Sequence, residues 1–306
     1  MNFPQPDKFD WIYFRQLLSL ALFKAETVRV KTGYFFQNNL EYQYLADDFF
    51  SLIKDLKLGE IKKEEDLIIY HPQQNISNFI VYQTENFSSI IEFFLFLLPI
   101  LFLEDFRVIL NWEGVTHSPL SYPTAFIKET FLPLLARWGL YASFRLEQFG
   151  FMGSALGKAE ARVYPSEFTR EEKNLDFTKG TISRVKIYFA KLNKEMAQKE
   201  KEIFKKGLEL KDDQISIIEV ANSSVFGNSI QVYIESDQIP LIFFREISFY
   251  NAAGDFIYDP GDHYDILQNL ILEIKNFKDK KILPPYLLRE YNFYKDLVFN
   301  NLTEKK

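Results

Sequence analysis

The sequence predicts an α+β fold built from repeated βαβαββ-type units, with a small α+β domain inserted after residue 180. Three observations lead to this prediction. One order of helices and strands occurs twice along the chain. The matching pairs Arg29-Val30 and Arg107-Val108 lie 78 positions apart (107 minus 29), about the length of one such unit. Beyond Gly180 the composition changes to a Lys/Glu-rich helix between strands, which indicates a different domain.

The first unit reads as helix, strand, helix, strand. The run TVRVKT alternates and is β-branched, which is typical of a strand, whereas Leu45, Phe49 and Leu52 recur at helical spacing. Gly59 follows the second helix as a C-cap. The predicted elements are Phe14–Phe23, Thr27–Thr32, Tyr44–Lys57 and Asp66–Tyr70.

The second unit repeats this order, with a strand before its first helix and two strands at its end. Gly139 closes its long helix 80 positions after Gly59 (139 minus 59). The apolar run Ile90–Leu103 has 14 residues, fewer than the roughly 20 that span a bilayer, so we expect a buried core helix and no membrane role. The predicted elements are Asn78–Gln83, Phe87–Leu103, Phe106–Asn111, Tyr122–Trp138, Tyr141–Gln148 and Lys158–Tyr164.

The repeat-built core is predicted to cover residues 1–180 and 250–306, and the inserted α+β domain residues 181–249. Linkers are expected at 166–180 and 251–261. The predicted elements of the insertion are Thr181–Phe189, Lys191–Leu210, Gln214–Val220, Ser229–Glu235 and Leu241–Phe249. A third, incomplete unit is predicted to follow, with helices Asp262–Phe277, capped by Asp262, and Pro285–Phe299.

Composition excludes several classes of function. The formal net charge of -6 does not favour nonspecific binding to nucleic-acid phosphates. The absence of cysteine excludes disulfides, thiolate nucleophiles and Cys-based zinc sites. The residues Asp259, Asp262, His263 and Asp265 fit a turn and a helix cap, so no metal site is expected. The first residues show no secretory signal, and we expect a cytoplasmic protein.

One segment, residues 114–165, combines a loop, a helix and glycine punctuation in a distinctive order. It contains Gly114-Val115-Thr116, Ser118-Pro119, Tyr122, Leu132-Pro133, Gly139, Gly150–Gly157 and Pro165. In these residues the chain resembles the RNA 3'-terminal phosphate cyclase family. Weaker similarity covers residues 15–72 and about 180–294. The resemblance implies the repeat architecture shared with EPSP synthase, with a small inserted α+β domain.

The resemblance also implies a reaction in two steps. A histidine is adenylated by ATP with a divalent metal, and the adenylate passes to an RNA 3'-phosphate, which the neighbouring 2'-hydroxyl then closes into a cyclic phosphodiester. In the family this histidine lies in a C-terminal element, to which no residue up to Lys306 corresponds. Such chemistry needs a nucleophilic imidazole and donors for phosphate oxygens.

Several family motifs are replaced in this chain. The Gly-Glu-Gly-Gly-Gly-Gln-x-x-Arg loop falls on Asp7–Arg15, where only Arg15 matches. The Leu-Arg-Pro-Gln-His-Leu motif falls on Leu40–Leu45; Gln43 matches, but a glutamate, Glu41, stands for the arginine and Tyr44 for the histidine.

Two further family motifs lie in later helices. The family's nucleotide-binding glutamine falls on Leu95, in the helix predicted over Phe87–Leu103. The Tyr/His-Leu-Ala-Asp-Gln element falls on Tyr286–Glu290, where Tyr286 and Leu287 match but Arg289 and Glu290 stand for Asp and Gln.

The candidate ligand groove is assigned to the residues that match or flank these motifs, namely Arg15, Gln43, His117, Ser118, Tyr122 and Tyr286. Aromatic residues in predicted loops near it are candidates for stacking on bases, namely Phe35, Phe36, Tyr42 and Phe151.

Three hypotheses about function stay open at this stage. The first is a cyclase-like protein without cyclase activity, which needs no cofactor and binds RNA ends or an RNA-processing protein. The second is an active ATP- and metal-dependent RNA 3'-end enzyme that uses Arg15, Gln43 and His117. The third is a protein–protein interaction module that uses a sheet edge left open by the incomplete third unit.

Overall fold

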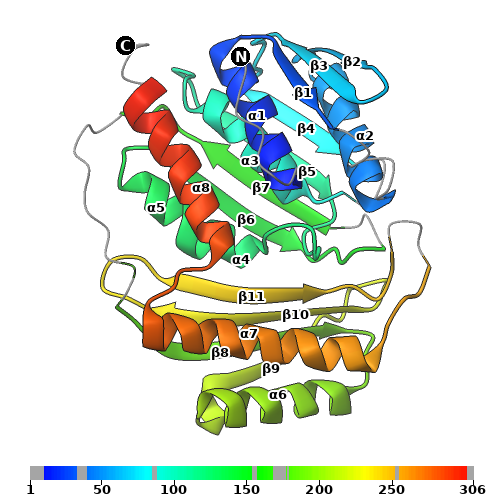
Figure 1. Cartoon of the computed structure of the whole chain (residues 1–306), viewed down its shortest axis with the longest axis vertical. Coiled ribbons are helices and arrows are strands. Elements are labelled where there is room, and N and C mark those ends of the chain that lie inside the picture. Colours follow the sequence, from blue (N-terminus) through cyan, green and yellow to red (C-terminus); the bar gives the residue numbers. More distant parts are fainter. Residues whose placement is uncertain are drawn as a thin grey trace.

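The computed structural model describes residues 10–32, 40–84, 88–153, 157–167, 177, 179–251 and 255–301. Its helices and three β-sheets form a mixed α+β fold, which confirms the predicted class. Figure 1 shows two blocks. One contains the elements before residue 165 together with the last helix, and the other contains a four-stranded sheet with two helices on one face.

The first sheet is three-stranded and antiparallel, in the order β1-β3-β2. Its strands and the helices α1 and α2 fall where the sequence predicts them, except that β2 was missed. The strand β2 has the sequence GEIKK, whose single apolar residue Ile61 gives no alternation to detect. The elements are α1 Trp11–Lys24, β1 Val28–Lys31, α2 Leu40–Asp55, β2 Gly59–Lys63 and β3 Leu67–Pro72.

The second sheet has the order β4-β5-β7-β6, with β4 and β5 parallel and joined by helix α3. Strands β5, β7 and β6 pair antiparallel in the same order as β1, β3 and β2. The elements before the helix predicted over 122–138 are β4 Phe79–Gln83, α3 Ile90–Leu101 and β5 Val108–Gly114. The strands after that helix are β6 Ala142–Gln148 and β7 Gly157–Val163.

The helix predicted over 122–138 is present in three pieces. A short α4, Thr124–Phe126, leads into a π-helical turn, Ile127–Phe131, and then into α5, Leu132–Ala136. Pro133 has no N–H to donate to the preceding turn, which explains why the regular hydrogen-bond ladder changes here.

The third sheet has the order β11-β10-β8-β9. Its elements are β8 Thr181–Ala190, α6 Lys194–Leu208, β9 Ile215–Glu219, β10 Gly227–Glu235 and β11 Leu241–Ile247. The next helix, α7 Pro260–Lys280, lies against α6 and β11 (Figure 1). We predict α7 as part of a third unit, and its contacts with α6 and β11 leave this assignment a prediction. The predicted division into domains itself stays a prediction.

The last helix returns to the first block. Helix α8, Pro285–Asp296, continues into a π-helical turn at Leu297–Asn301 and runs beside α1 (Figure 1). Helix α8 therefore brings residues near the end of the chain to the same place as the first helix.

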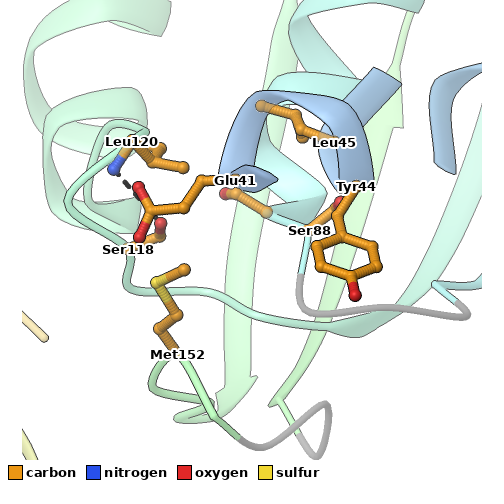
Figure 2. A pocket seen from close by; sticks show the side chains of 8 residues that line it. Glu41, Tyr44, Leu45, Ser88, Ser118, Leu120 and Met152 are labelled. Atoms are coloured by element: carbon orange, nitrogen blue, oxygen red, sulfur yellow. Dashed lines mark hydrogen bonds between the residues drawn. The ribbon is translucent and has the colours of Figure 1, made fainter. Parts of the chain in front are cut away.

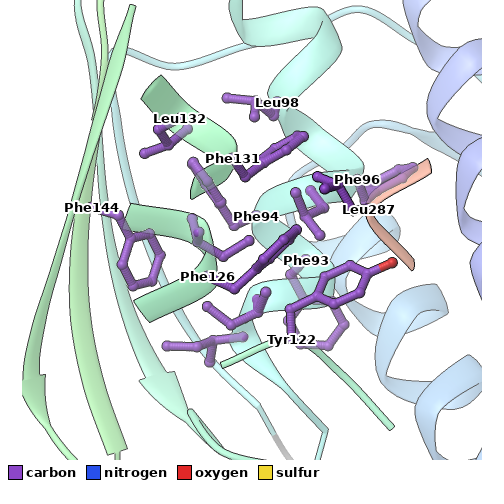
Figure 3. Packing of buried hydrophobic residues seen from close by; sticks show 14 of the residues in the cluster. Phe93, Phe94, Phe96, Leu98, Tyr122, Phe126, Phe131, Leu132, Phe144 and Leu287 are labelled. Atoms are coloured by element: carbon purple, nitrogen blue, oxygen red, sulfur yellow. The ribbon is translucent and has the colours of Figure 1, made fainter. Parts of the chain in front are cut away.

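The centre of the first block is helix α3, all twelve residues of which are buried. Phe94 contacts Phe144 of β6 at 5.3 Å between ring centroids, and Phe126 stacks on Phe131 at 6.2 Å (Figure 3). The apolar run around α3 is thus the core helix that the sequence predicts. Within the described ranges, no helix is both long and apolar enough to cross a membrane.

Candidate functional site

The predicted site residue Arg15 is completely buried in α1. Its Nε lies 2.9 Å from Glu92 Oε2 on α3, and its Nη2 contacts Glu290 Oε1 on α8. Glu290 also accepts a hydrogen bond from the hydroxyl of Tyr122 at 2.9 Å. Glu92 accepts two more, from Trp11 Nε1 at 3.1 Å and from the hydroxyl of Ser121 at 3.0 Å. We call Arg15, Glu92 and Glu290 the Arg15 cluster.

The Arg15 cluster holds its charges in a dry environment. Burial alone would lower the pKa of Arg15, but the Glu290 and Glu92 carboxylates raise it overall, so the guanidinium stays charged. Burial raises the pKa of Glu92, Arg15 opposes this, and Glu290 adds to it. Two carboxylates share one guanidinium, so the cluster has no spare positive charge for a phosphate.

The predicted site residue His117 is buried separately, under aromatic rings. Its imidazole stacks on Phe149 at 4.5 Å and lies 5.5 Å from Phe151. Its Nδ1 is 2.8 Å from Thr116 Oγ1, and its Nε2 has no hydrogen-bond partner among the residues that the structure describes. Burial lowers the pKa of His117 to about 3, so the ring is neutral at pH 7.

The glycines around this loop serve close backbone packing. Thr116 and His117 both donate backbone hydrogen bonds to the carbonyl of Gly150. A Cβ at Gly157 would lie 2.4 Å from the carbonyl oxygen of Gly114 and would collide with it. The glycine pattern that carries the resemblance therefore has a structural cause at this point.

Ser118 lies in a pocket that is almost filled (Figure 2). Its volume is about 10 Å³, which is enough for about one water molecule. Figure 2 shows Glu41 directed toward Ser118 and Leu120. The residues around this space are Glu41, Tyr44, Leu45, Ser88, Ser89, Ser118, Leu120 and Met152. The predicted site residue Gln43 is exposed on α2 and does not join them.

A larger cavity of about 280 Å³ lies between α1, α2, α8 and β11. Five of its twelve lining residues are aromatic; the lining contains Asp10, Trp11, Ile12, Tyr42, Glu92, Pro119, Leu120, Ser121, Tyr122, Phe244, Tyr286 and Arg289. The predicted residues Tyr122 and Tyr286 meet here, with ring centroids 6.1 Å apart. Tyr286 donates to the carbonyl of Ile242 at 2.8 Å, and Arg289 pairs with Asp10 at 2.6 Å. We call this space the aromatic cavity.

The structure thus brings three of the six predicted residues together, Arg15, Tyr122 and Tyr286. It leaves Gln43 and His117 apart from them, and Ser118 lies in the small pocket of Figure 2. Of the predicted stacking residues, Tyr42 lines the aromatic cavity and Phe151 is buried, whereas Phe35 and Phe36 lie outside the described residues. Sequence reasoning missed Glu92. A lone carboxylate inside the apolar run IIEFFLFLLPILFL was the signal, because a buried glutamate needs a partner.

The acidic stretch near α7 has a structural explanation. Asp259, rather than the predicted Asp262, caps the helix by accepting from the backbone N–H groups of Gly261 and Asp262. Pro260 occupies the first turn, where its missing N–H costs nothing, so the helix begins earlier than predicted. Among the described residues, no group of three or more His, Asp or Glu side chains is arranged to hold a metal ion.

The chain is similar in sequence to a known family and to several known proteins. The sequence model of a protein family described as RNA 3'-terminal phosphate cyclase matches residues 48–259. A Koribacter versatilis (strain Ellin345) protein named RNA 3'-terminal phosphate cyclase is 26% identical over 147 residues, which are 48% of this chain and 41% of that protein. A Pseudomonas aeruginosa (strain UCBPP-PA14) protein of the same name is 26% identical over 144 residues, 47% of this chain and 42% of the relative. The matched segments therefore cover less than half of these relatives.

Proposed function

The chain belongs to the RNA 3'-terminal phosphate cyclase family, and from this premise we propose that it lacks cyclase activity and acts as a binding or scaffold module linked to RNA processing. Its partner in this proposal is an RNA end or an RNA-processing protein. The observation that carries the proposal is the Arg15 cluster, because the one cation retained from the family's N-terminal loop is occupied by two carboxylates.

The surroundings of the cluster support the same proposal. We infer that the phosphates of ATP, which the family's reaction uses, have no suitable site among these residues. A nucleotide phosphate needs converging donors, whereas Glu41 and Glu92 line this region and the guanidinium of Arg289 is paired with Asp10. The position of the family's glutamine is occupied by Leu95, which is completely buried in α3.

The alternative of an active enzyme with a relocated site requires Arg15, Gln43 and His117 to act together. Arg15 is buried in its ion pairs, Gln43 is exposed on α2, and His117 is enclosed by Phe149 and Phe151. A nucleophilic imidazole must reach its substrate. These positions favour the first proposal over the alternative.

The repeat architecture is part of the proposal. The segments α1–β3 and α3–β7 contain helix, strand, helix, strand and strand in one order, and their last three strands pair alike. We interpret them as two copies of one unit. Residues 181–249 then form the insertion, on which α7 packs.

The proposal is tested by incubation of the purified chain with labelled ATP, Mg²⁺ or Mn²⁺, and an RNA that ends in a 3'-phosphate. We expect neither a protein-bound adenylate nor a cyclic phosphate. A relative from Pseudomonas aeruginosa serves as the positive control for the reagents. Either product, formed by this chain at a rate proportional to its concentration, would contradict the proposal.

A further inference from the structure

The aromatic cavity is surrounded by carboxylates. Asp10 and Glu92 line it, and Glu41, which precedes Tyr42 on α2, lines the small pocket of Figure 2. Burial raises the pKa of the Tyr42 hydroxyl, and the charges of Glu41, Asp10 and Glu92 raise it further. Three carboxylates from three different elements therefore act on one wall of the cavity.

The charge balance of the surroundings is negative. Three carboxylates face two guanidinium groups, which leaves an excess of one negative charge when all are ionised. The groups are Asp10, Glu92 and Glu290 against Arg15 and Arg289. Arg245 and Glu273, whose charges act on Tyr286, pair with each other at 2.7 Å and cancel. This count covers the part of the chain that the structure describes.

The walls of the cavity suit a cation as well. Among the lining residues, Trp11 and Tyr42 lie parallel at 6.4 Å between ring centroids, and the centroids of Phe244 and Tyr286 lie 4.7 Å apart. The faces of such rings carry partial negative charge and attract ammonium and guanidinium groups. Tyr122 completes the aromatic lining.

We propose that the aromatic cavity binds an organic cation, a primary ammonium or guanidinium group on an aliphatic stem. This inference rests on the proposed function, since it assigns to the same region a ligand of opposite charge to a phosphate. The cavity of about 280 Å³ lies just below the range of about 300–1,000 Å³ that is common for ligand sites. It therefore has room for one side chain or a small amine and not for a nucleotide.

The cation has two sources with the same chemistry, a free small amine or a Lys or Arg side chain of a partner polypeptide. Probes for the two are n-butylammonium and the capped peptide acetyl-Gly-Lys-Gly-amide. The matched neutral probes are n-butanol and the same peptide with norleucine in place of lysine. Butyrate is the anionic probe of equal length.

Binding is measured by thermal shift and by intrinsic tryptophan fluorescence, because Trp11 forms part of the wall. Titrations run to about 50 mM probe at constant ionic strength, since a ligand that binds only the folded state raises its melting temperature. We expect butylammonium to bind at least about fivefold more tightly than butanol, and butyrate to bind more weakly than both.

Two variants change the charge at the rim in opposite directions. Asp10→Asn keeps the helix-capping oxygen and removes one negative charge, so we expect about threefold to tenfold weaker amine binding. Arg289→Gln removes a positive charge, so we expect tighter binding by a similar factor. Glu60→Gln, exposed on β2 and distant from the cavity, is the control and should change nothing.

Equal binding of butanol, tighter binding of butyrate, no binding of either amine, or no response to the Asp10 and Arg289 variants would each overturn the inference. Amine binding by the free probe alone identifies a small molecule, and binding by the lysine peptide identifies a polypeptide. Failure of the proposed function is seen separately, as cyclic phosphate product in the turnover assay.

Discussion

Arg15 and His117 are two basic side chains of the candidate site, and the protein buries them in different ways. Arg15 is buried with two carboxylates and stays charged. His117 is buried between phenylalanine rings with no carboxylate beside it and is neutral. A buried base keeps its charge only where a counterion enters the core with it. In both cases the side chain is unavailable to a phosphate in solution.

The largest effect is expected from breaking the Arg15 cluster. Arg15→Met leaves Glu92 and Glu290 buried without their cation, which should lower the free energy of unfolding by about 3–5 kcal/mol. Urea denaturation measures the change. Lys158→Met, which removes an exposed pair with Glu113, is the matched control and should cost less than about 1 kcal/mol.

The triple change Arg15→Met, Glu92→Gln and Glu290→Gln sharpens this test. It removes the whole set of charges, so we expect it to recover about half or more of the loss caused by Arg15→Met alone. A single variant as stable as the parent would show that Arg15 is not held by these carboxylates.

The second effect concerns pH. The pKa of His117 is about 3 in the folded protein and near 6.5 in the unfolded chain. Between these pH values the imidazole is therefore protonated in the unfolded chain and neutral in the folded protein. Its contribution to stability is therefore complete above pH 6.5 and is lost as the pH falls toward 3. At pH 5 the loss amounts to about 2 kcal/mol.

This contribution is isolated by comparing the parent with His117→Phe between pH 7.5 and 5. The variant should lose less stability over that range, whatever its stability at pH 7.5. Identical pH slopes for the two proteins would mean that His117 titrates normally and is accessible to water.

The smallest expected effect is the difference between a hydrogen bond to a charged acceptor and a hydrogen bond to a neutral acceptor. Tyr122→Phe removes a hydrogen bond to the Glu290 carboxylate and should cost about 1.5–2 kcal/mol. Tyr286→Phe removes a hydrogen bond to the carbonyl of Ile242 and should cost about 1 kcal/mol. Denaturation midpoints of both variants give the comparison. If Tyr286→Phe costs more, the cluster does not strengthen the bond of Tyr122.

The α+β fold class and nearly all helices and strands could be predicted from the sequence because each carries its own periodicity. The exceptions have local causes. Strand β2 has one apolar residue, and Asp259 caps α7 ahead of Asp262 through a proline turn. The packing of α7 on α6 and β11 could not be predicted, because the pattern of an amphipathic helix shows which face is apolar but not which sheet that face will cover.

Three residues of the candidate site could be predicted from the resemblance, but their charge partners could not. The resemblance located Arg15, Tyr122 and Tyr286, which the structure brings close together. It gave no indication that Glu92 and Glu290 reach Arg15, since these residues are far apart in sequence and meet only when α1, α3 and α8 pack. Whether an arginine that matches a family motif can bind a phosphate depends on such neighbours.

The central claim is that the region around Arg15 does not hold a phosphate, and isothermal titration with ATP–Mg²⁺ tests it most directly. We predict no saturable heat up to about 1 mM ligand, the limit of a binding free energy near -4 kcal/mol. Saturable binding with a Kd below about 1 mM, retained at physiological salt and weakened in Arg289→Gln, would contradict the claim.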